Sequence, residues 1–356
     1  MSAEGAGQAR YCRKASECRP FGPEGDVVVN PPRPHGRGLL NIGPSGLRIQ
    51  AQLIIGKIQQ IWRYPVKSMS GQALDDCAVG ILGLPGDRGW ALRDEKTKEI
   101  TNGKRIPQLM QCAARYREEP HNGTIPHVDI TCQDDTPIGS DETDVNEKLS
   151  KVLGKTVSLW PLQAPTNKAH YRRASVVSRL SHFKVVRSQL PRLLRLRNVD
   201  AQLRETFSRE PGEPLPDLTQ LPAEVLEFTS PLGTYFDAYP IHLLTTASLE
   251  AMAGFNSAAV WNVRRFRPNF LIETDEGIEG LIEAGWGGRH LRIGPLELKC
   301  EIPTVRCGMT THAQAGLPKD PSVLRSIVKD ADQNLGIYAS VVSAGRVAVN
   351  DSVALL

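Results

Sequence analysis

The sequence predicts a mixed β/α protein in which a small N-terminal β-barrel-like module is followed by a β-barrel-like domain with peripheral helices. Three observations predict this class. Many apolar residues fall in short runs with strand-type spacing, and turn-forming residues separate these runs. Strand-type segments outnumber helical ones. A polar, arginine-rich stretch near the middle of the chain divides the strand-type segments into two groups.

The overall composition is that of a folded protein. Its 356 residues are 40% hydrophobic and 23% charged, which supplies enough apolar material for one large or two modest cores. The net charge of +4 is small for this length and argues against a dedicated nucleic-acid binder. Neither an apolar run of membrane-spanning length nor a secretory signal is visible. We therefore expect no transmembrane segment and a cytoplasmic location.

We expect four parts along the chain. Residues 1–50 are rich in Gly, Pro and Arg without apolar periodicity, which predicts a disordered tail. The small β-rich module follows at residues 53–165. Residues 166–228 are predicted to be a connection with a helical insertion, and the larger barrel-like domain occupies residues 229–356.

Patterning also predicts individual elements within the two β-rich parts. Strands are expected at residues 53–62, 89–93, 128–132, 336–342 and 346–349. A helix is expected at residues 246–253, and a hairpin turns at Gly294-Pro295. A second helix is predicted to begin after Asp320, because Asp is a favourable N-cap and Pro321 suits the first helical position.

The insertion carries a basic run. Its members are Arg187, Arg192, Arg195 and Arg197. This run is either the solvated face of a helix or a basic surface for an anionic membrane or an acidic electron-transfer protein. The leucines between these arginines suggest a helix, and a solvated helix face is the more common case for such a run.

The cysteines argue against a disulfide framework. Seven occur, at Cys12, Cys18, Cys77, Cys112, Cys132, Cys300 and Cys307. An odd count at irregular spacing in a chain of this length predicts reduced thiols. No C-x-x-C pair or Cys/His cluster occurs, so no ligands for a zinc ion or an internal iron–sulfur cluster are visible. A bound metal would therefore use few protein ligands.

Cys307 is the candidate reactive residue. It follows an apolar strand and precedes a polar loop, and such strand ends commonly present reactive groups. A soft thiolate suits molybdenum, and the adjacent cation of Arg306 favours the thiolate form. A lone cysteine near a strand is more often a small buried apolar residue, which is the interpretation we give to Cys300.

Several motifs together resemble one known family. They are Tyr64-Pro-Val-Lys-Ser68, Gly86-Asp-Arg-Gly-Trp90, Phe266-Arg-Pro-Asn269, Leu291-Arg-Ile-Gly294 and Pro303-Thr-Val-Arg-Cys-Gly-Met-Thr-Thr311. The last resembles the signature of MOSC domains, in which a cysteine at the position of Cys307 binds the molybdenum of a pterin cofactor. The first two resemble the β-barrel module that precedes MOSC in amidoxime-reducing proteins and in bacterial reductases of N-hydroxylated bases.

The resemblance implies a set of residues that bind molybdopterin. From the first module these are Lys67, Ser68 and Arg88, and from the larger domain they are Thr245, Thr246, Arg267, Asn269 and Arg306. Such cations and small polar groups are what the phosphate and the pterin edge require. Other interpretations stay open for some of them. Thr245 or Thr246 could cap the following helix, Lys67 and Ser68 could form a solvated turn, and Arg267 could pair with a surface carboxylate.

The resemblance also implies a function. Cys307-bound molybdenum would deliver two electrons to an oxygen atom bound to nitrogen or sulfur and release water, with N-hydroxylated bases such as amidoximes or hydroxylaminopurines as the substrate class. One alternative is a sulfur-transfer protein that carries a persulfide on Cys307. Another is a non-catalytic carrier of the molybdenum cofactor. Val305 stands where the mitochondrial reductases of this family carry a small hydroxyl side chain, so one hydrogen bond to the cofactor is not expected here.

The electrons for such a reaction are expected to come from another protein. The sequence contains neither ligands for an iron–sulfur cluster nor a dinucleotide-binding fingerprint, and it lacks a pyridoxal-phosphate domain. A ferredoxin, a flavoprotein or a haem protein would be the partner. His242 and His312 lie near the motifs, but histidines in such positions are more often structural than catalytic.

Overall fold

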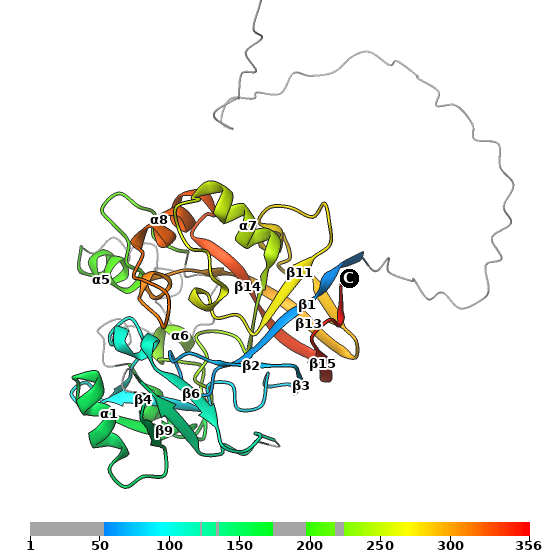
Figure 1. Cartoon of the computed structure of the whole chain (residues 1–356). Helices are drawn as coiled ribbons and strands as arrows, with labels where there is room; N and C mark the ends of the chain where they lie inside the picture. The colour runs from blue at the N-terminus through cyan, green and yellow to red at the C-terminus, as the bar shows by residue number, and fades with distance from the viewer. Residues whose placement is uncertain (1–52, 122, 133–134, 174–196, 218–223) are drawn as a thin grey trace, which may run out of the picture. The chain divides into compact units, whose positions relative to one another are not determined.

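The computed structural model describes residues 53–121, 123–132, 135–173, 197–217 and 224–356 (Figure 1). The expected tail and the arginines at positions 187, 192 and 195 lie outside the described residues. Within the described part the predicted mixed class is confirmed. A seven-stranded barrel carries helices, and smaller antiparallel sheets form the first module.

The strands of the described chain alternate with short helices. The strands are β1 (Leu53–Arg63), β2 (Gln72–Leu74), β3 (Asp76–Val79), β4 (Trp90–Asp94), β5 (Glu99–Ile100), β6 (Ala113–Tyr116), β7 (Val128–Thr131), β8 (Pro137–Gly139), β9 (Val157–Pro161), β10 (Ile241–Thr245), β11 (Phe270–Thr274), β12 (His290–Ile293), β13 (Leu296–Val305), β14 (Asn334–Ser343), β15 (Gly345–Ala348) and β16 (Ser352–Leu355). The helices are α1 (Val145–Leu153), α2 (Lys168–Tyr171), α5 (Arg197–Phe207), α6 (Glu224–Glu227), α7 (Thr246–Phe255) and α8 (Pro321–Asp330), with 3₁₀ turns η1 (Pro107–Gln111), η3 (Val263–Arg265), η4 (Ile282–Gly285) and η5 (Gly308–Thr311).

The barrel is a closed sheet in the strand order β11-β10-β14-β13-β12-β16-β1, and β1 also pairs with β11 to close it. The pairs are antiparallel except β10–β11, where Leu243 lies opposite Phe270. Closure leaves no free edge among these seven strands, which removes a surface prone to pair with other chains, and β2 extends the sheet from the last residues of β1. Side chains from these strands fill the barrel. Its fully buried core includes Ile58, Ile61, Phe270, Leu291, Leu298 and Ile337.

Helices α7 and α8 lie together against one side of the barrel (Figure 1). Each begins at a side-chain cap: Thr245 accepts a hydrogen bond from the Ser248 amide, and Asp320 accepts one from the Ser322 amide. The predicted start of α8 after Asp320 is therefore confirmed. The two helices share an apolar cluster with the barrel wall that includes Met252 and Val323, and this burial stabilises them.

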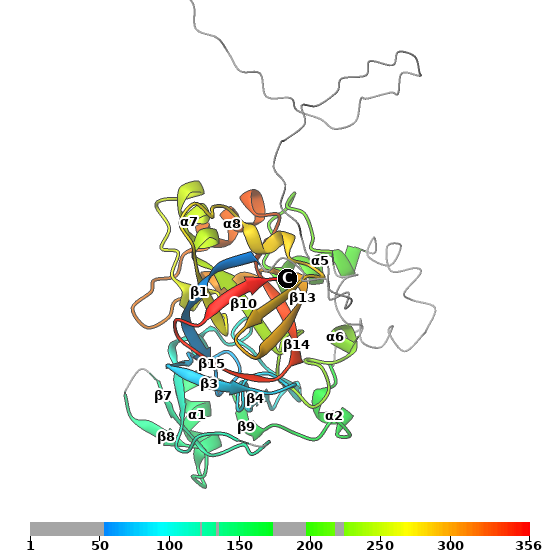
Figure 2. The same ribbon diagram turned by 90° about the vertical axis from the view of Figure 1, so that its right-hand side faces the viewer.

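The first module consists of two three-stranded antiparallel sheets, β5-β4-β9 and β6-β7-β8, with α1 packed against them. Its own core includes Val66, Trp90, Leu109, Ile130 and Leu149. A two-stranded sheet links the parts, because β3 pairs with β15 from the end of the chain (Figure 2).

Strand β1, at the start of the segment expected to form the first module, is a strand of the barrel. It pairs with β11 and β16. Local sequence pattern cannot reveal this, because both partners lie about two hundred residues or more further along the chain. The consequence for function is that the loop after β1 starts at the barrel and enters the module, where it carries Lys67 and Ser68.

The expectation that all cysteines are reduced is wrong for two of them. Cys112 and Cys132 form a disulfide, and their Cα atoms are 4.2 Å apart. They are neighbours because they flank the paired residues Ala113 and Thr131 of strands β6 and β7. A sequence separation of 20 residues hides this proximity. Cys77, Cys300 and Cys307 are free thiols.

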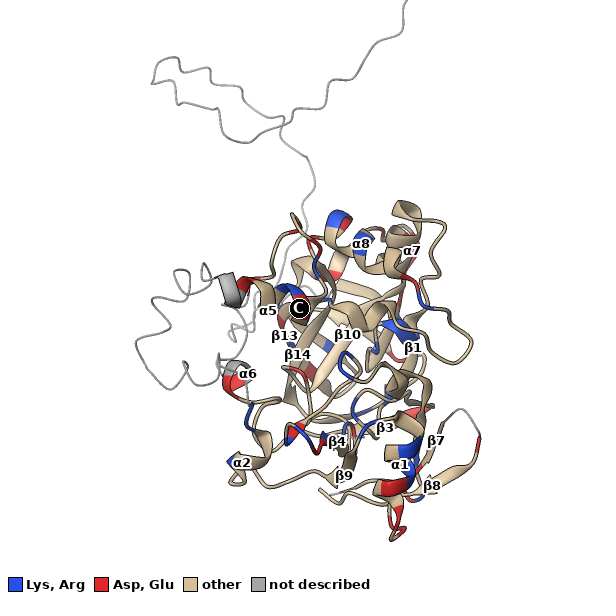
Figure 3. Ribbon diagram, turned by 90° about the vertical axis from the view of Figure 1, so that its left-hand side faces the viewer, with Lys and Arg blue, Asp and Glu red and all other residues tan. Residues whose placement is uncertain are grey.

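The surface of the described part carries mixed charge. Basic and acidic residues are interspersed over both the module and the barrel (Figure 3). Helix α1 is an example, since Glu147 lies near its start and Lys151 near its end, an order that suits the helix dipole. None of the described helices has the length and apolarity needed to cross a membrane.

Gly56 provides a test of the barrel closure. It pairs with Thr274 of β11 on one side and with Val353 of β16 on the other. Its φ is +147°, and a Cβ at this position would lie 1.9 Å from the Glu273 backbone oxygen. We therefore expect Gly56→Ala to lower the free energy of unfolding by at least about 3 kcal/mol, measured by chemical denaturation, because backbone strain and strand separation add.

The matched control for this change is Gly288→Ala. Gly288 also has a positive φ, +79°, but a Cβ there would meet no atom within 4 Å. This variant should lose only about 1 kcal/mol, which is the conformational cost alone. Equal losses in the two variants would contradict the tight approach of β1 to β11.

Candidate functional site

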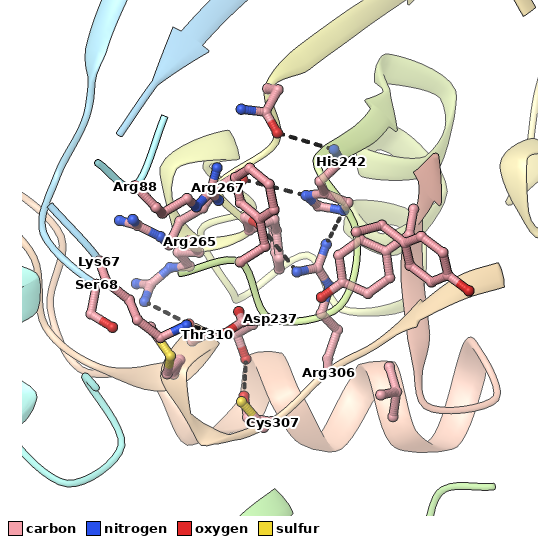
Figure 4. Close-up of a pocket in the computed structure, with 17 residues that line it drawn as sticks. Lys67, Ser68, Arg88, Asp237, His242, Arg265, Arg267, Arg306, Cys307 and Thr310 are labelled. Atoms are coloured by element: carbon pink, nitrogen blue, oxygen red, sulfur yellow. Dashed lines mark hydrogen bonds and ion pairs between the residues drawn. The ribbon is translucent and has the colours of Figure 1, made fainter. Parts of the chain in front are cut away.

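The predicted reactive cysteine opens onto a pocket where the loops of the first module meet one end of the barrel (Figure 4). The pocket contains a cavity of about 90 Å³. Most of the residues expected to bind the cofactor line it: Lys67, Ser68, Arg88, Arg267, Asn269, Arg306 and Cys307. Sequence positions more than two hundred residues apart are thus brought to one site.

Cys307 and Cys300 differ in their surroundings as the sequence predicted. Cys300 is fully buried within β13, and burial raises the pKa of its thiol to about 12, so it is unreactive at neutral pH. Cys307 follows the end of β13, is partly exposed and lines the pocket. It is the single thiol in the pocket lining.

The loop after β1 brings Lys67 and Ser68 to the pocket. The Lys67 amide donates to the Trp90 carbonyl at 2.8 Å, which fixes this loop to β4. The Lys67 ammonium donates to the Tyr235 carbonyl at 2.7 Å and to the Asp237 carboxylate at 2.8 Å. Burial lowers the pKa of Lys67, and the Asp237 charge opposes this shift.

Arg88 is held beside the pocket by a buried carboxylate. Asp87 has no solvent-exposed side-chain surface and accepts hydrogen bonds from the Tyr64 amide at 2.8 Å and the Asn269 side chain at 3.1 Å. It also pairs with the guanidinium of Arg88. That guanidinium lies over the Tyr64 ring, 4.7 Å from its centre. The carboxylate and the ring together fix the direction of Arg88.

Arg267 enters the pocket from the barrel side. Its guanidinium lies over the same Tyr64 ring, 4.1 Å from the centre, and donates to the Met69 carbonyl. The Nη2 atom of Arg267 is buried and has no hydrogen-bond partner. Burial lowers the pKa of Arg267 to about 10, so the group still carries its charge at neutral pH. A buried cationic donor without a partner is costly, and this one lines the pocket.

Three pocket residues have left-handed backbone conformations. Ser68, Arg88 and Arg267 have φ values of 68°, 51° and 55°. Non-glycine residues in this region are strained by about 1–3 kcal/mol each, and such strain concentrates at functional sites. Each lies in a short loop, where local hydrogen bonds such as that from the Arg88 amide to the Tyr64 carbonyl at 2.6 Å maintain it.

Arg306 forms a buried pair with His242. Its guanidinium donates to the Leu335 carbonyl at 2.8 Å, the Phe266 carbonyl at 3.1 Å and the His242 Nε2 atom at 2.7 Å. Because a guanidinium only donates, Nε2 must be unprotonated and the ring proton is on Nδ1. Burial and the Arg306 charge hold the pKa of His242 well below 6.5. Arg306 is thus occupied by protein groups, and His242 is neutral.

The remaining predicted residues take structural positions. Asn269 lines the pocket, but its side chain is used within the protein: it accepts from the His242 amide at 3.0 Å and donates to Asp87. Thr245 and Thr246 lie outside the pocket lining. Thr245 caps α7 and donates to Glu283 at 2.8 Å, and Thr246 interacts with Thr274. For Thr245, the capping role left open by the sequence is the one the structure has.

Sequence reasoning missed several residues of the site. Asp237 lies in the loop before β10 and pairs with Lys67, although nothing in its local pattern singles it out. Tyr64 was part of a quoted motif, but its role as the ring beneath two arginines was not visible. Arg209, which follows α5, donates to the Arg306 carbonyl at 3.0 Å. The insertion has no clear apolar periodicity around Arg209, so its sequence does not indicate this contact.

Comparisons with known proteins bear on the same residues. The chain matches the MOSC N-terminal beta barrel domain over residues 55–173 and the MOSC domain over residues 233–354. It is 25% identical over 333 residues to mitochondrial amidoxime-reducing component 1 of Mus musculus, with 85% of this chain and 83% of that protein covered.

Solved structures are more distant. The YuaD protein from Bacillus subtilis is matched at 10% identity and a TM-score of 0.37, over 85% of this chain and 96% of that one. YiiM from Escherichia coli is matched at 12% identity and a TM-score of 0.26, over 33% of this chain and 54% of its own.

The two domain matches meet at the pocket. The first contains Lys67, Ser68 and Arg88, and the second contains Arg267 and Cys307. The chain is therefore a MOSC protein, in which a MOSC N-terminal beta barrel domain is followed by a MOSC domain.

Proposed function

We propose that this chain is a molybdenum-cofactor-dependent oxidoreductase that reduces N-hydroxylated compounds with electrons from a separate carrier protein. The similarity to a protein named as an amidoxime-reducing component supports the reaction class. The observation that carries the proposal is the buried Nη2 atom of Arg267, which lacks a partner and lines the same pocket as the Cys307 thiol.

The pocket fits the chemistry of a phosphorylated pterin. Lys67, Arg88 and Arg267 bring three cations to one cavity, and Ser68 adds a hydroxyl. Cationic forks and ammonium groups are the partners that phosphate groups prefer, and a soft thiolate suits molybdenum. An anion at this site would give Arg267 the hydrogen-bond partner that the protein does not supply.

The size of the cavity constrains how such a cofactor is held. Its volume of about 90 Å³ is below the roughly 300–1,000 Å³ that is usual for small-molecule sites. The cavity alone therefore holds only part of the molecule. The remainder of the cofactor would either extend into solvent or take a place made by moving two side chains. These are Lys67, which now pairs with Asp237, and Arg88, which now pairs with Asp87.

When bound, the cofactor would supply the metal that exchanges two electrons with the substrate. The protein's own groups bind and orient. Cys307 would provide the metal ligand, and Arg267 and Arg88 would provide positive charge beside it. The Lys67 ammonium has three N–H donors and uses two on Tyr235 and Asp237, so one remains for a ligand or for proton delivery. His242 is not suited to protonate the substrate, because it is neutral and bound to Arg306.

The first prediction concerns the metal ligand. Cys307→Ser should abolish benzamidoxime reduction and molybdenum retention, because a hard oxygen replaces a soft sulfur without a change in volume. Elemental analysis of the purified protein measures the metal, and far-ultraviolet circular dichroism should show that the fold is intact. Equal molybdenum content in both proteins would contradict the assignment.

Cys300→Ser is the matched control. This residue lies on the same strand but is fully buried, so the change should lower stability while leaving the molybdenum content per folded protein unchanged. Wild-type protein that contains no molybdenum but carries a persulfide on Cys307 would instead support the sulfur-carrier alternative.

A second prediction concerns the unpartnered arginine. Arg267→Gln should weaken cofactor retention by about tenfold to a hundredfold, because a charge-assisted hydrogen bond contributes about 1.5–3 kcal/mol. Molybdenum and pterin content after dialysis are the measurements. Arg292→Gln, which changes an exposed arginine on β12, should retain both at wild-type levels. Retention by the Arg267 variant would show that the cofactor phosphate is bound elsewhere.

A third prediction concerns the electron supply. The protein with NADH alone should not reduce benzamidoxime, whereas reduced methyl viologen, or a flavoprotein together with a ferredoxin or haem carrier, should support turnover. The reason is that a bound metal centre needs only electrons and protons to be regenerated. Product formation can be followed by chromatography. Turnover with NADH alone would rule out the external carrier.

A further inference from the structure

Three chain segments meet around Cys307. They come from the turn after β5, from the end of α5 and from the start of η5. We call the six residues through which they touch the rim: Gly103, Lys104, Phe207, Ser208, Gly308 and Met309. A Cβ on Gly103 would lie 3.2 Å from the Met309 methyl group, and the Lys104 ammonium lies 5.3 Å from the centre of the Phe207 ring.

The segment from Phe207 to Arg209 contacts the residues on both sides of Cys307. Arg209 donates to the carbonyl of Arg306, which directly precedes the cysteine. Ser208 lies so close to Gly308, which directly follows it, that a Cβ on this glycine would be 2.2 Å from the Ser208 hydroxyl oxygen. The segment therefore contacts the residue before Cys307 and the residue after it.

Arg209 anchors the segment. It is 5% exposed and makes three hydrogen bonds: to the Arg306 carbonyl at 3.0 Å, to the Gln333 side chain at 3.2 Å and to the Phe207 carbonyl at 2.8 Å. Each joins the segment to itself or to the loops at the ends of β13 and β14. A buried guanidinium with these bonds is held in one geometry, and its removal would leave several carbonyl groups unpaired.

A second arginine holds the same segment from outside. Arg325 on α8 donates to the Ser208 carbonyl and forms an ion pair with Glu213. The segment is thus fastened to the MOSC domain at two points. By contrast, Phe207 is only half buried, and its ring faces Lys104 from the first module. The Arg209 guanidinium also lies 6.0 Å from the centre of this ring, but the hydrogen bonds of Arg209 and Arg325 do not involve the ring, so its loss would leave them in place.

We infer that Phe207, Ser208 and Arg209 form the outer wall of the Cys307 site, in which Phe207 limits the width of molecules that reach the sulfur and Arg209 is the positioning residue that holds the wall. The two sides of the rim come from different parts of the chain, because Lys104 belongs to the first module and Phe207 to the segment between the two domains. Met309 belongs to the rim and also lines the pocket, so the rim and the pocket share a residue.

This wall has a consequence for substrate choice, which rests on the proposed reductase function. Lys104 and Arg209 both lie over the Phe207 ring, 5.3 Å and 6.0 Å from its centre, so a molecule branched next to the reacting group must displace the ring or Lys104. The Lys104 ammonium also disfavours a cationic group at that point. The preferred substrate class is therefore unbranched beside the N–O bond, and neutral or anionic at its reacting end.

The test measures access to Cys307 directly and does not require bound cofactor. The full-length apoprotein is treated with iodoacetamide, a small reagent, or with a fluorescein maleimide, a bulky one, and modification of each cysteine is followed by peptide mass spectrometry. Phe207→Ala should raise the rate with the bulky reagent at Cys307 by at least about fivefold, which corresponds to about 1 kcal/mol, and change the iodoacetamide rate by less than about twofold.

Variants of the anchor complete the test. Arg209→Gln should raise the bulky-reagent rate at Cys307 as much or more, and Arg209→Lys should restore only part of the protection, since a lysine cannot reproduce the fork. Arg292→Gln, on β12, serves as the matched control and should behave as the wild type. Far-ultraviolet circular dichroism and the melting temperature identify any variant that fails to fold.

Two outcomes would overturn the inference. Unchanged bulky-reagent rates in folded Phe207→Ala would show that the segment does not form the wall. Equal increases with both reagents in that variant would show general loosening rather than control of width. Neither outcome depends on molybdenum, so a failure of the reductase proposal, seen as an absence of metal or turnover, is distinguishable from a failure of this one.

Discussion

The buried carboxylate of Asp87 is the interaction on which the geometry of the pocket depends. It accepts hydrogen bonds from the backbone at Tyr64 and from the side chain of Asn269, and it pairs with Arg88. These partners belong to different parts of the chain: the loop after β1, the barrel and the module. A buried charge with its hydrogen bonds satisfied is tolerated, but loss of one partner typically costs about 3–5 kcal/mol. The module and the barrel are therefore held in one relative position at the pocket.

That relative position of the two parts determines where the cationic side chains lie. Arg88 and Arg267 come from the two domains and both contact the ring of Tyr64, at 4.7 Å and 4.1 Å from its centre. Burial lowers the pKa of Arg267 and of Arg306 to about 10, yet both remain charged near neutral pH. Carbonyl groups and the tyrosine ring offset part of the desolvation cost, but Arg267 keeps one unsatisfied donor. An anion in this pocket would supply the missing partner and offset part of that cost.

Much of the local structure could be predicted from the sequence, because its signals are local. The start of α8 follows from Asp320 and Pro321, and the turn of the β12–β13 hairpin follows from Gly294-Pro295. The position of Cys307 after a strand, and the buried character of Cys300, also follow from short patterns.

What could not be predicted depends on contacts between distant residues. The closure of the barrel by β1 and the pairing of Cys112 with Cys132 are set by tertiary neighbours. In the site, motif order indicated that Arg306 and Asn269 are near the pocket, but not that their polar groups are already used by His242 and Asp87. Proximity follows from the motif, whereas the partner of each polar group is decided by packing.

The contrast between Cys300 and Cys307 shows how position along one strand determines chemistry. Cys300 lies opposite Ala339 in the regular part of the β13–β14 ladder, with its side chain in the barrel core. Beyond it the register shifts on both sides of Pro303, and such irregularities redirect the side chains that follow. The ladder ends at Val305, and Cys307 then faces the pocket.

A strand end without support would be mobile, and a mobile thiol would bind a metal poorly because ordering it costs free energy. The support here comes from hydrogen bonds made to and by Arg306, the residue before the cysteine. Arg209 binds the Arg306 carbonyl, while the Arg306 guanidinium is fixed by Leu335, Phe266 and His242. The backbone of Arg306 is thus held from one side and its side chain from the other. The direction of the Cys307 side chain is set by this arrangement, which links the arginine-rich insertion to the chemistry of the MOSC domain.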